Sequence, residues 1–151
     1  MRYSLDTSAI LDGRIRYYPV DVFPALWGNF EGLVHSGGIK ATEIVRHELE
    51  RLDDEVLKWT RGLSLFVDVD EEIQMIVSDI LKSHDRLVAE GGQRSRADPF
   101  VIALAKQNKC AVVTAENGGT QQKPKIPFVC KSLGIECITI LDLIRRERWT
   151  F

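Results

Sequence analysis

Short apolar segments alternate with longer amphipathic ones, and this alternation constrains the fold of the chain more than any other feature. The segment CAVVT at 110–114 consists almost entirely of apolar and β-branched residues, and the segments 3–6 and 136–140 have a similar character. Such strands are too apolar to face water, so helices must cover both faces of the sheet they form. The pattern predicts one α/β domain over 1–151, with three α/β/α layers around a mainly parallel sheet of about four to five strands.

The amphipathic segments carry helix start and stop signals. Apolar residues between 22 and 34 form a helical stripe that begins near Pro24 and ends at Gly37 and Gly38. A longer stripe predicts a single helix from a capping Thr42 to Thr60. The polar, glycine-containing stretch 82–96 is the best candidate for a mobile loop. We also expect a first helix over 7–13, later helices at 71–83, 98–109, 127–134 and 142–149, a strand at 38–41, and a short strand or extended link at 63–69.

The composition is that of a soluble globular protein, with 44% apolar and 28% charged residues. A net charge of −2 provides no general attraction to nucleic acid, so a polyanionic substrate would need a local basic patch or metal ions. The three cysteines have no paired metal-ligand spacing, which favours reduced, buried thiols over a zinc site. No segment resembles a signal peptide or a membrane span, so we expect a cytoplasmic protein without membrane contact.

Two acidic residues follow predicted strands directly. Asp6 ends the first strand, and Glu116 lies two residues beyond Thr114 at the end of CAVVT. In open parallel sheets, catalytic and binding residues gather at the carboxyl ends of the strands. Taken singly, Asp6 is also explained as a helix cap, and Glu116 as a solvated loop residue.

Two further acids lie on predicted helices. Glu48 falls on an apolar stripe, four residues from both Ile44 and Leu52, where a carboxylate is costly unless an arginine or a bound cation pairs with it. Asp98 precedes Pro99 at a predicted helix start, where it would cap the helix and could also point into an adjacent site. The stripe that we expect this helix to bury consists of Ile44, Val45, Leu49, Leu52 and Val56.

The order of four short motifs resembles the PIN domain, a metal-dependent nuclease fold that includes the VapC toxins of toxin–antitoxin pairs. The motifs are DTSAIL after the opening strand, EIVRHEL on an early helix, ADPFVIALA on a late helix, and VVTAEN. Two longer stretches, RYYPVDVFPALWGNFEGLV and KIPFVCKSLGIECITILDLI, make the chain look more specifically like a little-characterised PIN-like family of bacteria and archaea. That resemblance covers essentially the full chain.

The resemblance implies an acidic metal-binding and catalytic cluster of Asp6, Glu48, Asp98 and Glu116. It also implies supporting hydroxyl groups from Thr7 or Ser8, and from Thr114. The chain departs from the family at Glu116, where aspartate is commoner. The additional methylene group moves the carboxylate, which changes metal spacing or makes the contact water-mediated. Glu116 is therefore the least secure of the four.

Clustered carboxylates without sulfur ligands suit Mg²⁺ or Mn²⁺. The expected reaction is metal-dependent hydrolysis of RNA phosphodiesters, with Asp6 as the central ligand and Asp98 and Glu48 beside it. The substrate would also need positive charge outside the site, although these groups are equally explained as solvated charges, especially the lysines. The candidates are Arg94, Arg96, Lys123 and Lys125.

The resemblance further implies a toxin role, an antitoxin partner that covers the site, and homodimerisation. One alternative is a non-catalytic PIN-like module that binds RNA or protein, which Glu116 and the acidic pI of about 5.9 favour. A more remote alternative is another α/β phosphohydrolase, or a phosphoacceptor domain that uses Asp6. That alternative leaves Glu48 on the apolar stripe unexplained.

Overall fold

The computed structural model describes residues 1–88 and 96–151. Its centre is a five-stranded sheet in the order β3-β2-β1-β4-β5, and all of its strand pairs are parallel. The predicted α/β class and the parallel sheet are therefore confirmed. The strands are β1 (Tyr3–Leu5), β2 (Ile39–Thr42), β3 (Phe66–Val67), β4 (Ala111–Val113) and β5 (Cys137–Ile138).

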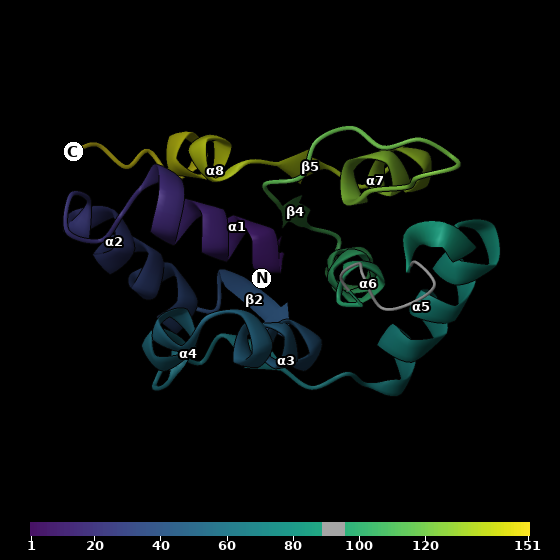
Figure 1. Ribbon diagram of the computed structural model, residues 1–151, viewed down its shortest axis with the longest axis horizontal. Coiled ribbons are helices and arrows are strands. Elements are labelled where there is room, and N and C mark those ends of the chain that lie inside the picture. The colour runs from purple at the N-terminus through teal and green to yellow at the C-terminus, as the bar shows by residue number, and fades with distance from the viewer. Residues whose placement is uncertain (89–95) are drawn as a thin grey trace.

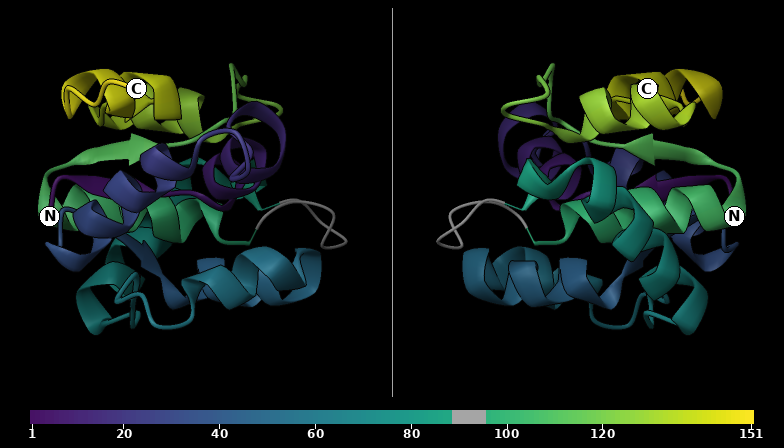
Figure 2. Two further views of the ribbon diagram at one scale, coloured as in Figure 1. Left: turned by 90° about the vertical axis from the view of Figure 1, so that its left-hand side faces the viewer. Right: turned by 90° about the vertical axis from the view of Figure 1, so that its right-hand side faces the viewer.

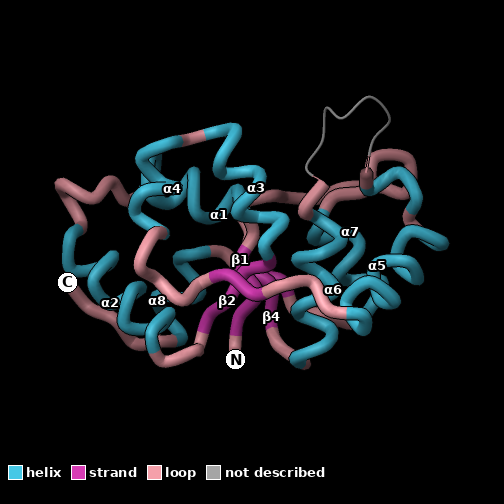
Figure 3. Tube along the Cα trace, turned by 90° about the horizontal axis from the view of Figure 1, so that it is seen from below, coloured by secondary structure: helices cyan, strands magenta, loops and turns pink. Residues whose placement is uncertain are grey.

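Helices cover both sides of the sheet, as its apolar strands require. Figure 1 shows α1, α2 and α8 on one side and α5, α6 and α7 on the other, with α3 and α4 beside β2. Figure 3 shows the same division from below, with the strands in the middle. The helices are α1 (Thr7–Leu11), α2 (Pro24–His35), α3 (Glu43–Leu52), α4 (Asp54–Thr60), α5 (Glu71–Ser83), α6 (Asp98–Asn108), α7 (Ile126–Leu133) and α8 (Ile140–Arg146).

The first helix extends beyond the predicted segment 7–13. After α1 the chain continues as a π-helical segment, η1 (Asp12–Tyr17). The Arg14 guanidinium lies 4.0 Å from the centroid of the Trp59 ring and 5.0 Å from that of Trp27. These cation–π contacts attach η1 to α2 and α4. Tertiary contacts of this kind stabilise a helical turn that apolar spacing alone does not indicate.

The predicted single helix from Thr42 to Thr60 is wrong, because the chain breaks at Asp53 between α3 and α4. Asp53 is extended, with φ −157° and ψ 112°, and its Oδ1 accepts a 2.8 Å hydrogen bond from the Val56 backbone N–H. This side chain caps α4, so the two helices take different directions. Leu52, which the continuous stripe would have buried, is 59% exposed at the end of α3.

Smaller differences concern caps and the predicted loop. Asp98 is the first residue of α6, and Ala97 occupies the N-cap position that the sequence indicated for Asp98. Thr42 is the N-cap residue of α3, but its side chain makes no capping bond within the described part of the chain. Within the predicted loop 82–96, α5 continues to Ser83 and a 3₁₀ turn, η2 (Asp85–Leu87), follows. Residues 89–95 lie outside the described residues.

The central strands are buried on both faces, and β1 and β4 are buried at every position. Figure 2 shows from the side that the C-terminal helices lie above these strands and that α3 and α4 lie below them. Cys130 is buried, whereas Cys110 and Cys137 are half-buried, and all of them are free thiols. None of the helices in the described ranges is long and apolar enough to cross a membrane. Because every strand is parallel, all of the carboxyl ends lie at one edge of the sheet.

Candidate active site

The predicted acidic residues are all attached to elements that meet at this carboxyl edge. Asp6 follows β1 directly, and Glu116 follows β4 by three residues. Glu48 lies on α3, the helix that leaves the carboxyl end of β2. Since α6 returns the chain to the amino end of β4, its first residue, Asp98, starts at the carboxyl edge. A 2.7 Å hydrogen bond from Ser4 Oγ to the Val101 carbonyl fixes α6 against β1.

Asp6 stands at the N-cap position of α1, but its side chain makes no capping hydrogen bond. Its Oδ2 instead accepts hydrogen bonds from Ser8 Oγ at 2.5 Å and from Thr114 Oγ1 at 2.7 Å. Its Oδ1 is buried and accepts no hydrogen bond from any residue in 1–88 or 96–151. One carboxylate oxygen is therefore fixed by two hydroxyl groups, while the other is buried without a hydrogen-bond donor among the described residues. Burying an acceptor without a donor ordinarily lowers the stability of the folded protein.

The two hydroxyl groups are themselves positioned by the loop after β4. Ser8 Oγ accepts a 3.0 Å hydrogen bond from the Ala115 N–H, and Thr114 Oγ1 accepts one of 3.1 Å from the Glu116 N–H. Each hydroxyl group thus accepts a hydrogen bond from a backbone N–H and donates its own hydrogen bond to Asp6. These bonds join the start of α1 to the end of β4 and fix the orientation of the carboxylate.

Burial is the main reason why the pKa of the Asp6 carboxyl is raised from 3.8 to about 6. The hydrogen bonds from Ser8 and Thr114 act in the opposite direction and lower this pKa. The negative charges of Glu116 and then Glu48 raise it further. Asp6 therefore lies within electrostatic reach of both glutamates, and its ionised form is poorly stabilised by the protein alone.

Glu48 is buried, with only 5% of its surface exposed. Its Oε1 accepts a 2.9 Å hydrogen bond from Thr7 Oγ1. The adjacent residues Thr7 and Ser8 thus bind different carboxylates, Thr7 that of Glu48 on α3 and Ser8 that of Asp6. This pair of contacts joins α1 to α3 and sets the two acids side by side along the sheet edge.

Glu116 is half-buried, and its carboxylate contacts the start of α7. Its Oε2 accepts a 3.0 Å hydrogen bond from the backbone N–H of Ile126, the first residue of α7. The carboxylate therefore satisfies one of the unpaired N–H groups at the start of this helix. Sequence reasoning missed this contact because ten residues separate the two partners along an irregular loop.

Asp98 is buried, with only 4% of its surface exposed. Within the described ranges, no three His, Cys, Asp or Glu side chains form a group that could hold a metal ion as it stands. The negative charges of Glu116 and Glu48 both act on Asp6, and Asp98 starts at the same edge of the sheet.

The structure describes three of the four basic residues that were predicted to bind the substrate. Arg94 lies outside the described residues. Arg96 is exposed and lies two positions before Asp98. Lys123 and Lys125 are also exposed, and Lys125 is the N-cap residue of α7, directly before the Ile126 N–H group that binds Glu116.

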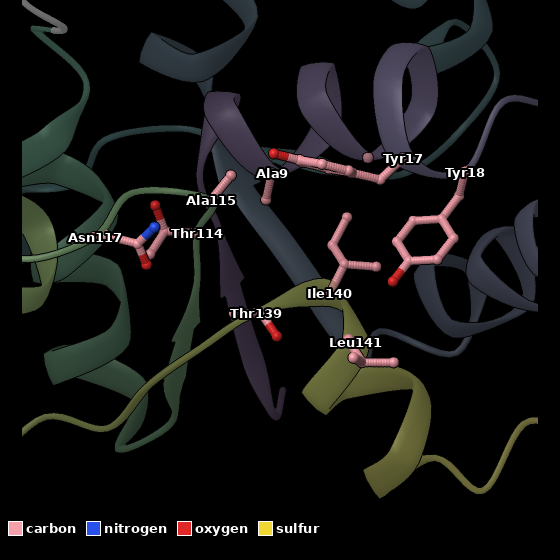
Figure 4. A pocket seen from close by; sticks show the side chains of 10 residues that line it. Ala9, Tyr17, Tyr18, Thr114, Ala115, Asn117, Thr139, Ile140 and Leu141 are labelled. Atoms are coloured by element: carbon pink, nitrogen blue, oxygen red, sulfur yellow. The ribbon is translucent and has the colours of Figure 1, made fainter.

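A pocket of about 270 Å³, which was not predicted from the sequence, is lined by Thr114, the residue whose hydroxyl group binds Asp6. Thr114 and Ala115 form its wall beside Asp6, and η1 and the first turn of α8 form the other walls (Figure 4). Tyr17, at the end of η1, lines the pocket although 58% of its surface is exposed. The sequence did not predict this wall, because the pocket is created by the tertiary packing of η1 against α8 and no local pattern around Tyr17 specifies that packing.

Comparison with known proteins places this site on a known fold. The chain matches, over residues 3–151, the model of the family described as Domain of unknown function (DUF4411). The crystal structure of VapBC2 from Rickettsia felis bound to a DNA fragment from their promoter is similar, with a TM-score of 0.56 and 14% identity, over 92% of this chain and 98% of that chain. The structure of FitAcB from Neisseria gonorrhoeae has a TM-score of 0.51 and 19% identity, over 91% and 96%. No curated protein matches the chain. At these identities the likeness shows a shared PIN-like fold.

Proposed function

This chain belongs to the family described as Domain of unknown function (DUF4411), and we propose from its acidic site that it is a metal-dependent endoribonuclease. The observation that carries the proposal is the state of Asp6. Its Oδ2 is held by two hydroxyl groups, and its Oδ1 is buried without a donor among the described residues. Burial, and to a smaller extent the charges of two glutamates, raise its pKa. A hard divalent cation would supply the missing partner of Oδ1 and offset the three negative charges.

The residues fit Mg²⁺ or Mn²⁺, because all of the nearby candidate ligands are carboxylate oxygens. Asp6 would be the central ligand, with Glu48 and Asp98 beside it and Glu116 as the least secure member. A bound cation would supply Lewis-acid chemistry to a phosphodiester. Ser8 and Thr114 would hold the Asp6 carboxylate in one orientation, and Thr7 would do the same for Glu48.

The partners follow from the same proposal. RNA is the expected substrate, and Arg96, Lys123 and Lys125 are candidates for binding its phosphates at the rim of the site. The resemblance to VapC toxins and the likeness to VapBC2 and FitAcB support a toxin role. We propose that the protein acts in the cytoplasm. An antitoxin protein would then cover the acidic edge, and the toxin would form a homodimer.

A second candidate function is a non-catalytic module of the same fold that binds RNA or protein. The contact between Glu116 and the Ile126 N–H favours it, because a carboxylate engaged in a helix cap is less available to a metal ion. A phosphoacceptor role for Asp6 has less support, since it gives no reason for the buried Glu48 beside it.

Cleavage of single-stranded RNA by the purified protein separates these functions. We expect cleavage with Mn²⁺ or Mg²⁺ and none with a chelator. Asp6→Asn should lower the rate at least about 100-fold, since several kcal/mol of transition-state stabilisation depend on the metal, and about 1.4 kcal/mol corresponds to a factor of ten. Asp79→Asn removes an exposed charge on α5 and serves as the matched control. Equal rates for wild-type protein and Asp6→Asn would contradict the proposal, and RNA binding without turnover would favour the non-catalytic module.

A further inference from the structure

The pocket between η1 and α8 shares a wall with the acidic site. Thr114, which donates a hydrogen bond to Asp6 Oδ2 at 2.7 Å, also lines this pocket. Figure 4 shows Asn117 and Thr114 at one end of the pocket and Tyr18 at the other. The Tyr17 side chain extends along one wall above Ile140, with its hydroxyl group beside Ala9. Thr114 thus links the acidic site to the pocket, although Asp6 itself is not one of the residues that line the pocket.

The walls of this pocket are uncharged. Its lining within the described residues consists of apolar and aromatic side chains, a glycine, Asn117 and two threonines, without any Asp, Glu, Lys or Arg. A phosphate group or a Lys or Arg side chain would lose its hydration there without gaining a counter-charge. A neutral group with apolar faces and a polar edge fits these walls best.

Two side chains offer the contacts that a planar heterocycle needs. Tyr17 lines the pocket and leaves 58% of its surface exposed, so its ring is accessible to a ligand. Its neighbour Tyr18 is fixed by an edge-on contact with the Phe23 ring at 5.5 Å, and its carbonyl accepts a 2.6 Å hydrogen bond from Trp27 Nε1. The end of η1 is thereby held in place. Asn117 is an exposed amide with both donor and acceptor atoms.

We propose that this pocket is a nucleobase subsite for the nucleotide adjacent to the scissile phosphate. Tyr17 stacks on the base, and Asn117 forms hydrogen bonds with its edge. Single-stranded RNA is bound in this way because unstacked bases present both a π-face and a hydrogen-bonding edge. The inference rests on the proposed ribonuclease function, which places a phosphodiester at Asp6, and it adds the residues that would select the nucleotide.

Binding of abasic RNA to a cleavage-deficient protein tests this subsite. The protein is Asp6→Asn, and the probes are a short fluorescent single-stranded RNA and derivatives that each lack one base. We expect one abasic position to weaken binding by about tenfold or more, in line with the loss of one stacking contact. Adding Tyr17→Ala should abolish that difference, whereas Tyr17→Phe should keep it. Met75→Ala removes an equally exposed side chain from α5, on the other side of the sheet, and should also keep it.

The outcomes separate this inference from the proposed function. If every abasic RNA binds as the intact RNA does, or if Tyr17→Ala retains the tenfold loss, the pocket is not a base subsite. Wild-type protein assayed with Mn²⁺ on the intact RNA tests the ribonuclease function separately, because cleavage there would leave that function standing whatever the abasic series gives.

Discussion

At the scale of single residues, Asp6 stands where an aspartate ordinarily accepts helix N–H groups, yet its side chain binds two hydroxyl groups. The carboxylate is buried, and its Oδ1 is without a donor among the described residues. Such a group lowers the stability of a folded protein, and it is tolerated at a functional site because the unpaired oxygen remains available to a ligand.

We therefore expect Asp6→Asn to stabilise the metal-free protein. The pKa of Asp6 is raised to about 6 by burial, so at pH 7 the ionised side chain is less stable in the folded protein than in the unfolded chain. A neutral amide removes this cost and the repulsion from Glu48 and Glu116. The free energy of unfolding should rise by roughly 1–3 kcal/mol in urea denaturation at pH 7 with a chelator present.

The control for this measurement is Asp79→Asn, which removes an exposed carboxylate and should change stability by less than about 0.5 kcal/mol. A clear loss of stability in Asp6→Asn would mean that the ionised carboxylate contributes to the fold, contrary to the burial argument.

The sequence indicated some of these residues and not others, for physical reasons. Glu48 was recognisable because a charge on an apolar stripe is costly, and its burial agrees with that argument. Asp6, Asp98 and Glu116 depended on motif resemblance, since each has an ordinary structural explanation. The bond between Glu116 and Ile126, and the wall formed by Tyr17, depend on tertiary placement that no local pattern specifies.

At the scale of elements, the close approach of η1 to α8 depends on Gly13. A Cβ atom at Gly13 would collide with Cδ1 of Ile140, the first residue of α8. The absence of a side chain lets these segments pack together beside the pocket. Gly28 on α2 is different, because a Cβ atom there would meet nothing within 4 Å.

The two glycines therefore predict opposite effects of the same substitution. Gly13→Ala should destabilise the protein, but by no more than about 1 kcal/mol, because the flexible end of the Ile140 side chain must leave its preferred rotamer while the helical backbone gains from alanine. Gly28→Ala should stabilise it by about 0.5–1 kcal/mol, because alanine favours an exposed helical position. Thermal unfolding of both variants measures the contrast, and an equal gain of stability in both variants would contradict the packing of η1 on α8.

Apolar periodicity predicted the elements where local signals and tertiary structure agree. The helix at 71–83 was predicted with the limits that the structure has. The break between α3 and α4 was missed, because the apolar spacing continues through it while the Asp53 side chain, through its bond to the Val56 N–H, caps a new helix. The π-helical geometry of η1 was missed as well, since it depends on Arg14 stacking over Trp27 and Trp59.

At the scale of the whole molecule, the strand order explains why Asp6 has neighbours on both sides. β1 lies between β2 and β4 at the centre of the sheet, so the residue after it meets α3 on one side and the β4 loop on the other. Alternating strands and helices predicted the parallel sheet, but not this order. The N-terminal strand is also joined to the C-terminal segment, because Tyr3 Oη donates a 2.7 Å hydrogen bond to Glu147 and Arg2 forms a 3.0 Å ion pair with it.

The bond from Tyr3 predicts a pH-dependent contribution to stability. Burial, and then the hydrogen bond to Glu147, raise the pKa of Tyr3 from 10.0 to about 12, so the folded state favours the neutral phenol. Its contribution, about 1 kcal/mol for a typical hydrogen bond, is present below pH 10 and is lost as the pH rises toward about 12.

Chemical denaturation of wild-type protein and Tyr3→Phe across this range should show a stability difference that disappears at high pH. Tyr17→Phe is the matched control, because the Tyr17 ring is exposed. A difference between wild-type protein and Tyr3→Phe that persists unchanged through pH 12 would argue that the phenol is not held in its neutral form.

Titration of Mn²⁺ into the metal-free protein by isothermal calorimetry tests most directly whether Asp6 holds a divalent cation. Asp79→Asn should bind Mn²⁺ as wild-type protein does, Glu48→Gln should bind it more weakly, and Asp6→Asn should show no binding at this site. The melting temperature provides a second readout, since a ligand that binds only the folded state raises it. A Mn²⁺ affinity in Asp6→Asn equal to that of the wild-type protein would contradict a metal site at Asp6.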